Sequence, residues 1–277
     1  MYLYHADALA LGGNLVRPLQ NIVSSQAACS LPPSGGVASC RVEKFSMNGL
    51  VSFDSAQSDL AGGIEEKGGK EYNVTRVSVV VEGLNVLNMV MADRIVMRLA
   101  AEHETGAAEP SIITTGSHYD GLRIAGHAAD ITTGHDLFSE MPTFGHFQTA
   151  WKKNGAGKKK ILGTLMGNTL PAAPAKSAPQ HLHDIHKGCQ EQRRARDIRQ
   201  TMLSSFVTGV SGIDGSEIKS WGPIIVVPQF GTIYLGEVMV SHSQRRMNML
   251  RLELGSPDGG SFSFGSGGAN GTPYPPI

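Results

Sequence analysis

Short stretches in which apolar and polar residues alternate dominate the first half of the chain. Alternation of this kind is typical of half-buried β-strands. The strongest stretch runs from Tyr72 to Val81, is rich in Val and Thr, and is followed by Glu82-Gly83. Tyr2 to Leu11 is a weaker example, and Arg94 to Ala101 fits a strand or a helix. We therefore expect the first half of the chain to be built mainly from strands.

Two further short strands are expected around the turn pair Asp120-Gly121. They cover Ile112 to Tyr119 and Leu122 to Ile131. Strand patterns return late in the chain, at Ile224 to Val227, Thr232 to Val240 and Met247 to Leu254.

The last of these strands alternates throughout. Its pattern predicts one face with Leu250 and Leu252 and an opposite face with Met247 and Met249.

The central part of the chain has a different character. Residues 140–151 suit a short helix, and residues 152–160 form a basic segment with two glycines. A Pro/Ala-rich linker is expected at 170–179, followed by a helix from Gln180 to Phe206. These patterns predict a largely helical insertion within a β protein.

The chain is therefore expected to be mainly β, an antiparallel sandwich or irregular barrel with a helical insertion. Its predicted parts are a β-rich region at 1–138, the basic, Pro/Ala-containing helical insertion at 139–215, and closing strands with a Gly/Ser-rich tail at 216–277. The predicted core contains Val77, Val79, Val81, Val96, Leu122, Ile124, Val226, Leu235, Leu250 and Leu252.

A polar-Gly-Leu pattern recurs three times in the first half of the chain. It occurs at Asn48-Gly49-Leu50, Glu82-Gly83-Leu84 and Asp120-Gly121-Leu122, with spacings of 34 and 38 residues. Each copy reads as a turn that leads into an apolar stretch, and a period in this range can indicate stacked units.

Composition adds a charge asymmetry to this picture. The 277 residues have zero net charge, but residues 151–200 hold 11 Lys and Arg against three acids, a local charge of +8. The rest of the chain carries the balancing −8, and such a chain can pair with itself, within one molecule or between copies. The low charged fraction of 17% and the 34 glycines favour tightly turned β structure over a helical bundle.

Cysteine usage and the N-terminus bear on location. Cys29 and Cys40 flank a Pro/Gly turn that can bring them together, but two reduced thiols are expected. Residues 1–18 lack the basic start of a signal peptide, and no apolar run is long enough to span a membrane. We expect a cytoplasmic protein, or one exported without a cleaved signal peptide.

A His-rich run at 181–189 is the first candidate for chemistry. His183 and His186 share a helix face, and Cys189 follows three residues later. Imidazole and thiolate are zinc ligands, so zinc is the cofactor that this run would hold. A polar helix start is the alternative. The run also resembles the His-x-His-x-Asp-His signature of metallo-β-lactamase-like hydrolases, but its Asp comes one place early, at Asp184.

A second candidate lies in the strands and turns between residues 118 and 136. His118 and Asp120 point to the same side of a strand, and His127 and Asp130 lie on the next one. His135-Asp136 follows in a turn. A His/Asp cluster can bind a metal or transfer protons, whereas Asp-Gly and Gly-His-Asp are also ordinary turn chemistry.

A third candidate is a basic patch for phosphate contacts. Its members are Lys158, Lys159, Lys160, Arg193, Arg194 and Arg196. Neither a phosphate-loop motif nor a Gly-x-Ser-x-Gly nucleophile motif occurs in the sequence.

Three segments carry a family resemblance. Val81 to Leu84, Met91 to Arg98 and Tyr119 to Gly126 resemble bacterial surface proteins of the choice-of-anchor P type, in which an Ala-Asp strand precedes a Gly-Leu turn. The late strand at Met249 to Leu254 sits where that family has a closing strand. The resemblance implies a β-rich fold and a bacterial origin, and it carries over no functional residues.

Three functions remain open at this point. The first is a non-enzymatic structural or interaction protein that self-associates through β surfaces and opposed charge blocks, with copies of itself as its partner. The second is a metal-dependent hydrolase that uses a His/Asp/Cys cluster. The third is a nucleic-acid-binding module that uses residues 151–200. We expect the first, because no specific catalytic or phosphate-binding motif is present.

Overall fold

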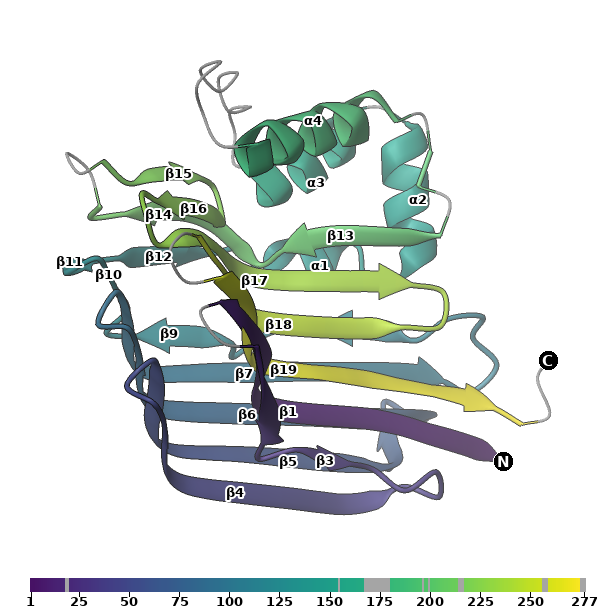
Figure 1. The fold of residues 1–277 in the computed structure, drawn as a ribbon. Coiled ribbons are helices and arrows are strands. Elements are labelled where there is room, and N and C mark those ends of the chain that lie inside the picture. The colour runs from purple at the N-terminus through teal and green to yellow at the C-terminus, as the bar shows by residue number, and fades with distance from the viewer. Residues whose placement is uncertain are drawn as a thin grey trace.

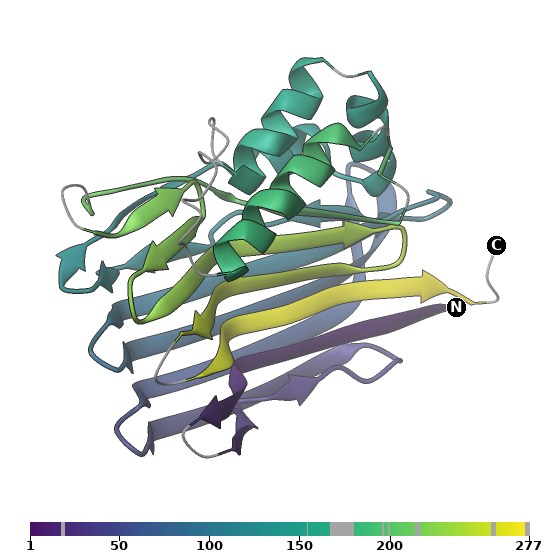
Figure 2. The same cartoon turned by 45° about the horizontal axis from the view of Figure 1, so that its top comes forward.

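Two antiparallel sheets pack face to face in the computed structural model, with a group of helices at one side (Figure 1, Figure 2). The structure describes residues 1–17, 20–153, 155–166, 180–195, 197–198, 200–213, 217–255 and 259–274. The architecture is an open sandwich and not a closed barrel, so the predicted mainly β, antiparallel fold with a helical stretch is confirmed.

The first sheet, sheet A, has the order β15-β16-β17-β18-β19-β1-β2, with β13 added beside β17 and β3 beside β1. It combines both ends of the chain, because β1 pairs with β19 along almost its whole length. Its strands are β1 (Tyr2–Arg17), β2 (Asn21–Gln26), β3 (Cys29–Ser30), β13 (Thr201–Ser205), β15 (Lys219–Trp221), β16 (Ile224–Val227), β17 (Gly231–Ser241), β18 (Arg245–Leu254) and β19 (Gly259–Pro273).

The second sheet, sheet B, has the order β11-β10-β7-β6-β5-β4, with β8 and β9 also paired to β7. Its long strands follow one another along the chain as a meander. Its strands are β4 (Gly36–Met47), β5 (Val51–Lys67), β6 (Lys70–Val86), β7 (Val90–Glu104), β8 (Ser111–Ile113), β9 (His118–Asp120), β10 (Arg123–Ile124) and β11 (His127–Ala128).

The helical stretch connects the two sheets and packs at one side of the sandwich. α2 and α3 contact β13, and α1 contacts β8, so these helices reach both sheets (Figure 1). The elements are α1 (Asp136–Glu140), α2 (Phe144–Lys152), α3 (Ala156–Met166) and α4 (Gln180–Arg194), with a two-stranded sheet of β12 (Asp130–Thr133) and β14 (Val207–Ser211) beside them. Their apolar contacts come from Leu137, Phe138, Phe144, Phe147, Trp151 and Ile161, all buried.

The predicted core is confirmed, since all ten predicted core residues are buried. One element prediction is wrong. The helix expected from Gln180 to Phe206 ends at Arg194, and its last part is strand β13, which pairs with β17. The linker expected at 170–179 lies outside the described residues and stays a prediction.

The predicted faces of β18 are also wrong. Met247, Met249, Leu250 and Leu252 are all buried, because the pairing on both sides of β18 is interrupted at Met249. One residue is passed over on each strand, so the register is kept, but the buried positions change at this point from Met247 and Met249 to Leu250 and Leu252.

The interruption at Met249 belongs to a row that crosses sheet A. On each of four neighbouring strands, one residue is left out of the regular pairing. These residues are Gly236 on β17, Met249 on β18, Gly265 on β19 and Ala10 on β1. A matching row crosses sheet B, where the pairing skips Lys44, Asp54, Gly83 and Asp93 on strands β4 to β7, and Gly121 between β9 and β10. We call these the sheet A row and the sheet B row. The strands of sheet B turn at this level, toward the left of Figure 1.

Both rows use the same backbone device on alternate strands. In sheet B, Lys44, Gly83 and Gly121 have φ values of 54°, 64° and 59°. In sheet A, Gly236 and Gly265 have φ values of 58° and 61°. This left-handed conformation disfavours residues with a Cβ, which explains glycine at four of the five positions.

Two copies of the polar-Gly-Leu pattern supply glycines to the sheet B row. A Cβ at Gly83 would lie 2.1 Å from Asp54 Oδ2, and a Cβ at Gly121 would lie 2.0 Å from Asp93 Oδ2. The repeated pattern therefore marks a repeated Gly-Asp contact between neighbouring strands. The third copy, at Gly49, lies in the tight turn between β4 and β5, where a Cβ would meet open space.

At the end of the sandwich near the N-terminus, Arg245 joins the sheets. Its side chain is fully buried, and its guanidinium donates to the carbonyl oxygens of His242 at 3.1 Å and Pro110 at 2.9 Å. Burial lowers the pKa of Arg245 to about 10. The guanidinium thereby ties the β17–β18 turn of sheet A to the β7–β8 connection of sheet B.

The sheet B row predicts a large effect for Gly83→Ala. We expect the free energy of unfolding to fall by about 2–3 kcal/mol, because alanine meets both the left-handed backbone and the Asp54 carboxylate. The measurement is urea unfolding at equilibrium. Gly49→Ala is the matched control, since Gly49 has φ +69° but open space around its Cβ, and should lose only about 1 kcal/mol.

Adding Asp54→Ala to Gly83→Ala should restore part of the loss, because the steric conflict is removed. Equal losses for Gly83→Ala and Gly49→Ala would show that the Asp54 contact contributes nothing.

Candidate interaction surface

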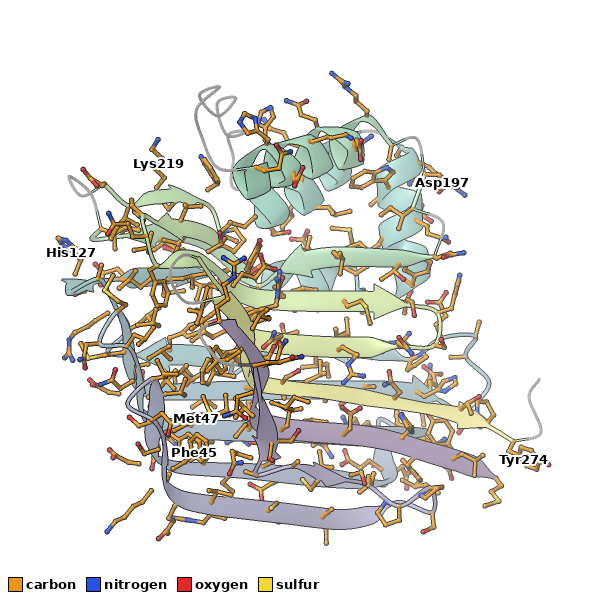
Figure 3. The ribbon with its side chains drawn as sticks, in the orientation of Figure 1. Phe45, Met47, His127, Asp197, Lys219 and Tyr274 are labelled. Atoms are coloured by element: carbon orange, nitrogen blue, oxygen red, sulfur yellow. The ribbon has the colours of Figure 1, made fainter. Side chains whose placement is uncertain are left out.

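Strand β4 forms an uncovered edge of sheet B. None of its residues is buried, in contrast to the central strands β6 and β7. At the opposite side of the sandwich, the helices pack against β13 and β8. Figure 3 shows the β4 side, with Phe45 and Met47 labelled near the end of the strand. An edge strand of this length presents unpaired backbone N–H and C=O groups to a further strand.

A shallow trough of about 660 Å³ crosses the outer face of sheet B and opens at β4. We call it the edge trough. Small residues line it, among them Ala61, Ser78 and Ala100, which belong to β5, β6 and β7. At the β4 end of the trough, Val37 is 83% exposed. The hollow exists because these small side chains lie beside longer side chains on the same face of the sheet.

Most charged groups around the edge trough already have partners. Arg76 binds Glu65 through two hydrogen bonds, one of 2.8 Å, and Lys67 lies 2.5 Å from Glu102. The hydrogen bond from Arg76 lowers the pKa of the Glu65 carboxyl. Arg98 is exposed, and within the described residues its guanidinium has no hydrogen-bonding or ion-pair partner.

The two halves of β4 differ in how readily a further strand could pair with them. The half from Gly36 to Cys40 carries no charge and pairs with β5 without interruption. The other half carries Arg41, Glu43 and the left-handed Lys44. Charges and irregular backbone are features that protect sheet edges. A further strand would therefore add to residues 36–40, next to the mouth of the edge trough.

The structure places His118 and Asp120 together but leaves His127 apart. His118 Nε2 lies 3.4 Å from Asp120 Oδ2, and both side chains are exposed on β9. β9 pairs with β7 at residues 94–96, whereas the β10–β11 hairpin that carries His127 pairs at residues 90–91. Six residues along a strand span roughly 20 Å, and His127 lies at the far left of Figure 3.

His135 has a structural position at the start of α1. Its ring stacks on Phe206 at 5.0 Å, with Nδ1 at 3.0 Å from Thr114 Oγ1 and Nε2 at 3.2 Å from the Ser117 carbonyl oxygen. A carbonyl oxygen only accepts, so Nε2 carries the hydrogen and Nδ1 accepts from the Thr114 hydroxyl. Burial lowers the pKa of His135, and both contacts suit the neutral ring.

This environment predicts that acid weakens the fold through His135. In the unfolded chain His135 titrates near its usual pKa of about 6.5, above its pKa in the folded protein. The unfolded state therefore binds the proton first, and the contribution of His135 to stability is complete above about pH 6.5 and is lost as pH falls through the folded pKa.

The measurement is the free energy of unfolding of the parent and of His135→Gln from about pH 8 to about pH 5. The advantage of the parent over the variant should shrink with falling pH. Two parallel curves would contradict the expectation.

The His-rich run lies on α4. His183 and His186 are partly exposed, and His186 Nε2 lies 3.4 Å from Gln190 Nε2. The side chain of Cys189 lies outside the described residues. Within the described part of the chain, no group of three or more His, Cys, Asp or Glu side chains is arranged to hold a metal ion. Zinc binding by this run stays a prediction.

The predicted basic patch is divided by contacts within the insertion. Lys158 donates to the Ala195 carbonyl oxygen at 3.1 Å and lies over the Trp151 ring at 4.6 Å. Lys160 pairs with Glu140 at 2.7 Å. Lys159 and Arg194 are exposed, whereas Arg196 and the side chain of Arg193 lie outside the described residues.

The sequence patterns missed the edge trough, although a signal was present. Outward positions on three neighbouring strands are small, at Ala61, Ser78 and Ala100, and register pairs these strands side by side. The signal depends on that register, which alternation alone does not give. Among the described residues, no helix is both long and apolar enough to cross a membrane.

These features define a class: a two-sheet antiparallel sandwich protein with a helical stretch at one side and an uncovered strand edge at the other. The chain belongs to the family of a domain of unknown function, DUF8256, whose sequence profile matches residues 2–241. That span includes β1 to β17, and therefore the edge trough and the helices. Searches of the curated proteins and of the solved structures found no match.

Proposed function

We propose that this protein is a non-enzymatic structural or interaction protein that self-associates by adding the β4 edge of one copy to the β4 edge of another. The observation that carries the proposal is the uncovered β4 edge with an uncharged half and the exposed Val37. Strand addition at a sheet edge gives affinity through backbone hydrogen bonds, and side-chain contacts give specificity.

A two-fold arrangement fits this edge. Antiparallel pairing centred on Ala38 would place Val37 opposite Ser39 of the second copy and would bury both exposed valines. It would also join the two edge troughs into one hollow across the combined sheet. The outer faces would contribute no charge conflict at the contact, because residues 36–40 are uncharged.

The opposed charge blocks contribute less to this proposal than the strand edge does. Lys158 and Lys160 of the basic segment are already engaged within the insertion. The resemblance to choice-of-anchor P type surface proteins supports a structural role, because its three segments contain Gly83, Asp93 and Gly121 of the sheet B row.

The test is the mass of the protein in solution, measured by size-exclusion chromatography with light scattering over a wide concentration range. We expect a dimer that dissociates on dilution. Val37→Lys should yield a monomer with unchanged melting temperature, because Val37 is exposed and the pairing would bring two lysines into diagonal positions across the contact.

Ile22→Lys is the matched control for the edge-pairing test. Ile22 is 78% exposed on β2, an edge of sheet A, and its substitution should leave the dimer intact. A parent that is monomeric at every concentration, or equal effects of the two substitutions, would overturn the proposal.

A further inference from the structure

Two cysteines from different sheets meet at the open side of the sandwich. Cys29 lies on β3 in sheet A, directly opposite Ala8 of β1. Cys40 lies on β4 in sheet B, directly opposite Ser58 of β5. Directly paired residues share a face of their sheet. Because Ala8 and Ser58 are buried between the sheets, both cysteines face the same interior.

Both cysteines are neighbours of Ser58, which limits the distance between them. The Cys29 Sγ lies 3.7 Å from the Ser58 carbonyl oxygen. Paired residues in an antiparallel sheet have Cα atoms about 4.5–5.5 Å apart, so Cys40 is an immediate neighbour of the same residue. Burial raises the pKa of the Cys29 thiol, and the adjacent Cys40 raises it further, which agrees with a short separation.

The connection between the cysteines is held in place by backbone hydrogen bonds. Leu31 N–H donates to the Ala6 carbonyl oxygen, and Tyr4 N–H donates to that of Pro33, both at 2.9 Å. Gly35 N–H closes a turn onto the Pro32 carbonyl oxygen at 2.9 Å. The ends of the connection are therefore positioned without help from a covalent link.

We propose that Cys29 and Cys40, both free thiols in this structure, form an intramolecular disulfide in the presence of a low-molecular-weight disulfide. One protein thiolate attacks the small disulfide, forms a mixed disulfide and releases one small thiolate. The second protein thiolate then attacks the protein sulfur of the mixed disulfide and releases the other small thiolate. The two protein thiols are oxidised by two electrons, and the small disulfide is reduced to two thiols that take up the two protons.

The bond would link the β3 end of sheet A to the β4 edge of sheet B. It would close a short loop and restrict separation of the two sheet edges in the unfolded and partly open states. The inference does not depend on self-association, because the Cys40 side chain faces the interior and not the free backbone edge of β4.

The experiment uses the full chain with Cys189→Ser, so that only two thiols remain. The protein is incubated under native conditions with oxidised glutathione, then analysed by thiol titration, intact mass and melting temperature. We expect loss of both thiols, a mass lower by two hydrogens, and a melting temperature raised by roughly 5 °C. Dithiothreitol should reverse all three changes.

Cys29→Ser and Cys40→Ser are the matched controls. Each should keep the melting temperature of the reduced parent, should show no rise with oxidised glutathione, and should retain a glutathione adduct on its remaining cysteine. Glutathione adducts that persist on the two-thiol protein, disulfide-linked dimers on non-reducing gels, or thiols that stay free would each overturn the proposal. Dimers that persist in dithiothreitol report on the strand-edge contact instead, so the two proposals fail separately.

Discussion

The sandwich depends on two rows of interrupted pairing that face each other across its core. The rows lie near each other, since a Cβ at Gly265 of the sheet A row would lie 3.9 Å from Ile95, two residues from Asp93 of the sheet B row. The Tyr119 hydroxyl, from sheet B, donates to the Met249 carbonyl oxygen in the sheet A row at 2.5 Å. An interrupted pair frees backbone groups, and a buried carbonyl without a partner is costly. The cross-sheet hydrogen bond satisfies one such group and fixes the level at which both sheets turn.

The surroundings of this hydrogen bond explain the position of His135, one member of the predicted His/Asp cluster. Phe206 packs over Gly236, where a Cβ would lie 2.7 Å from its ring, and Tyr119 and His135 both stack on Phe206. Burial raises the pKa of Tyr119 well above its usual value, so its hydroxyl remains a donor. Burial lowers the pKa of His135 in the same environment. The aromatic and imidazole groups here serve packing and backbone satisfaction around the turn of the sheets.

Much of the fold could be predicted from the sequence where burial imposes a period of two. Val77, Val79 and Val81 alternate on β6 because one face of that strand lines the core. The alternation is lost where burial is weak or the period breaks. β4 and β5 are edge-proximal and rich in Ser, Gly and charge, and β18 changes face at Met249. The end of the predicted helix at 180–206 became β13 because pairing with β17 outweighed local helix preference.

The candidate chemistry was harder to predict than the fold, since residue type gives no distance. His118 and His127 are close in sequence but lie about six residues apart along β7, while Cys29 and Cys40 converge on Ser58 from two sheets. The polar-Gly-Leu repeat was the more informative signal, because left-handed glycines mark where strands turn whatever the side chains around them. At the edge strand the same row uses Lys44, a residue with a Cβ in the left-handed conformation. Among the described strands, none lies beyond β4 to crowd that position, so the edge tolerates a strain that the interior strands avoid with glycine.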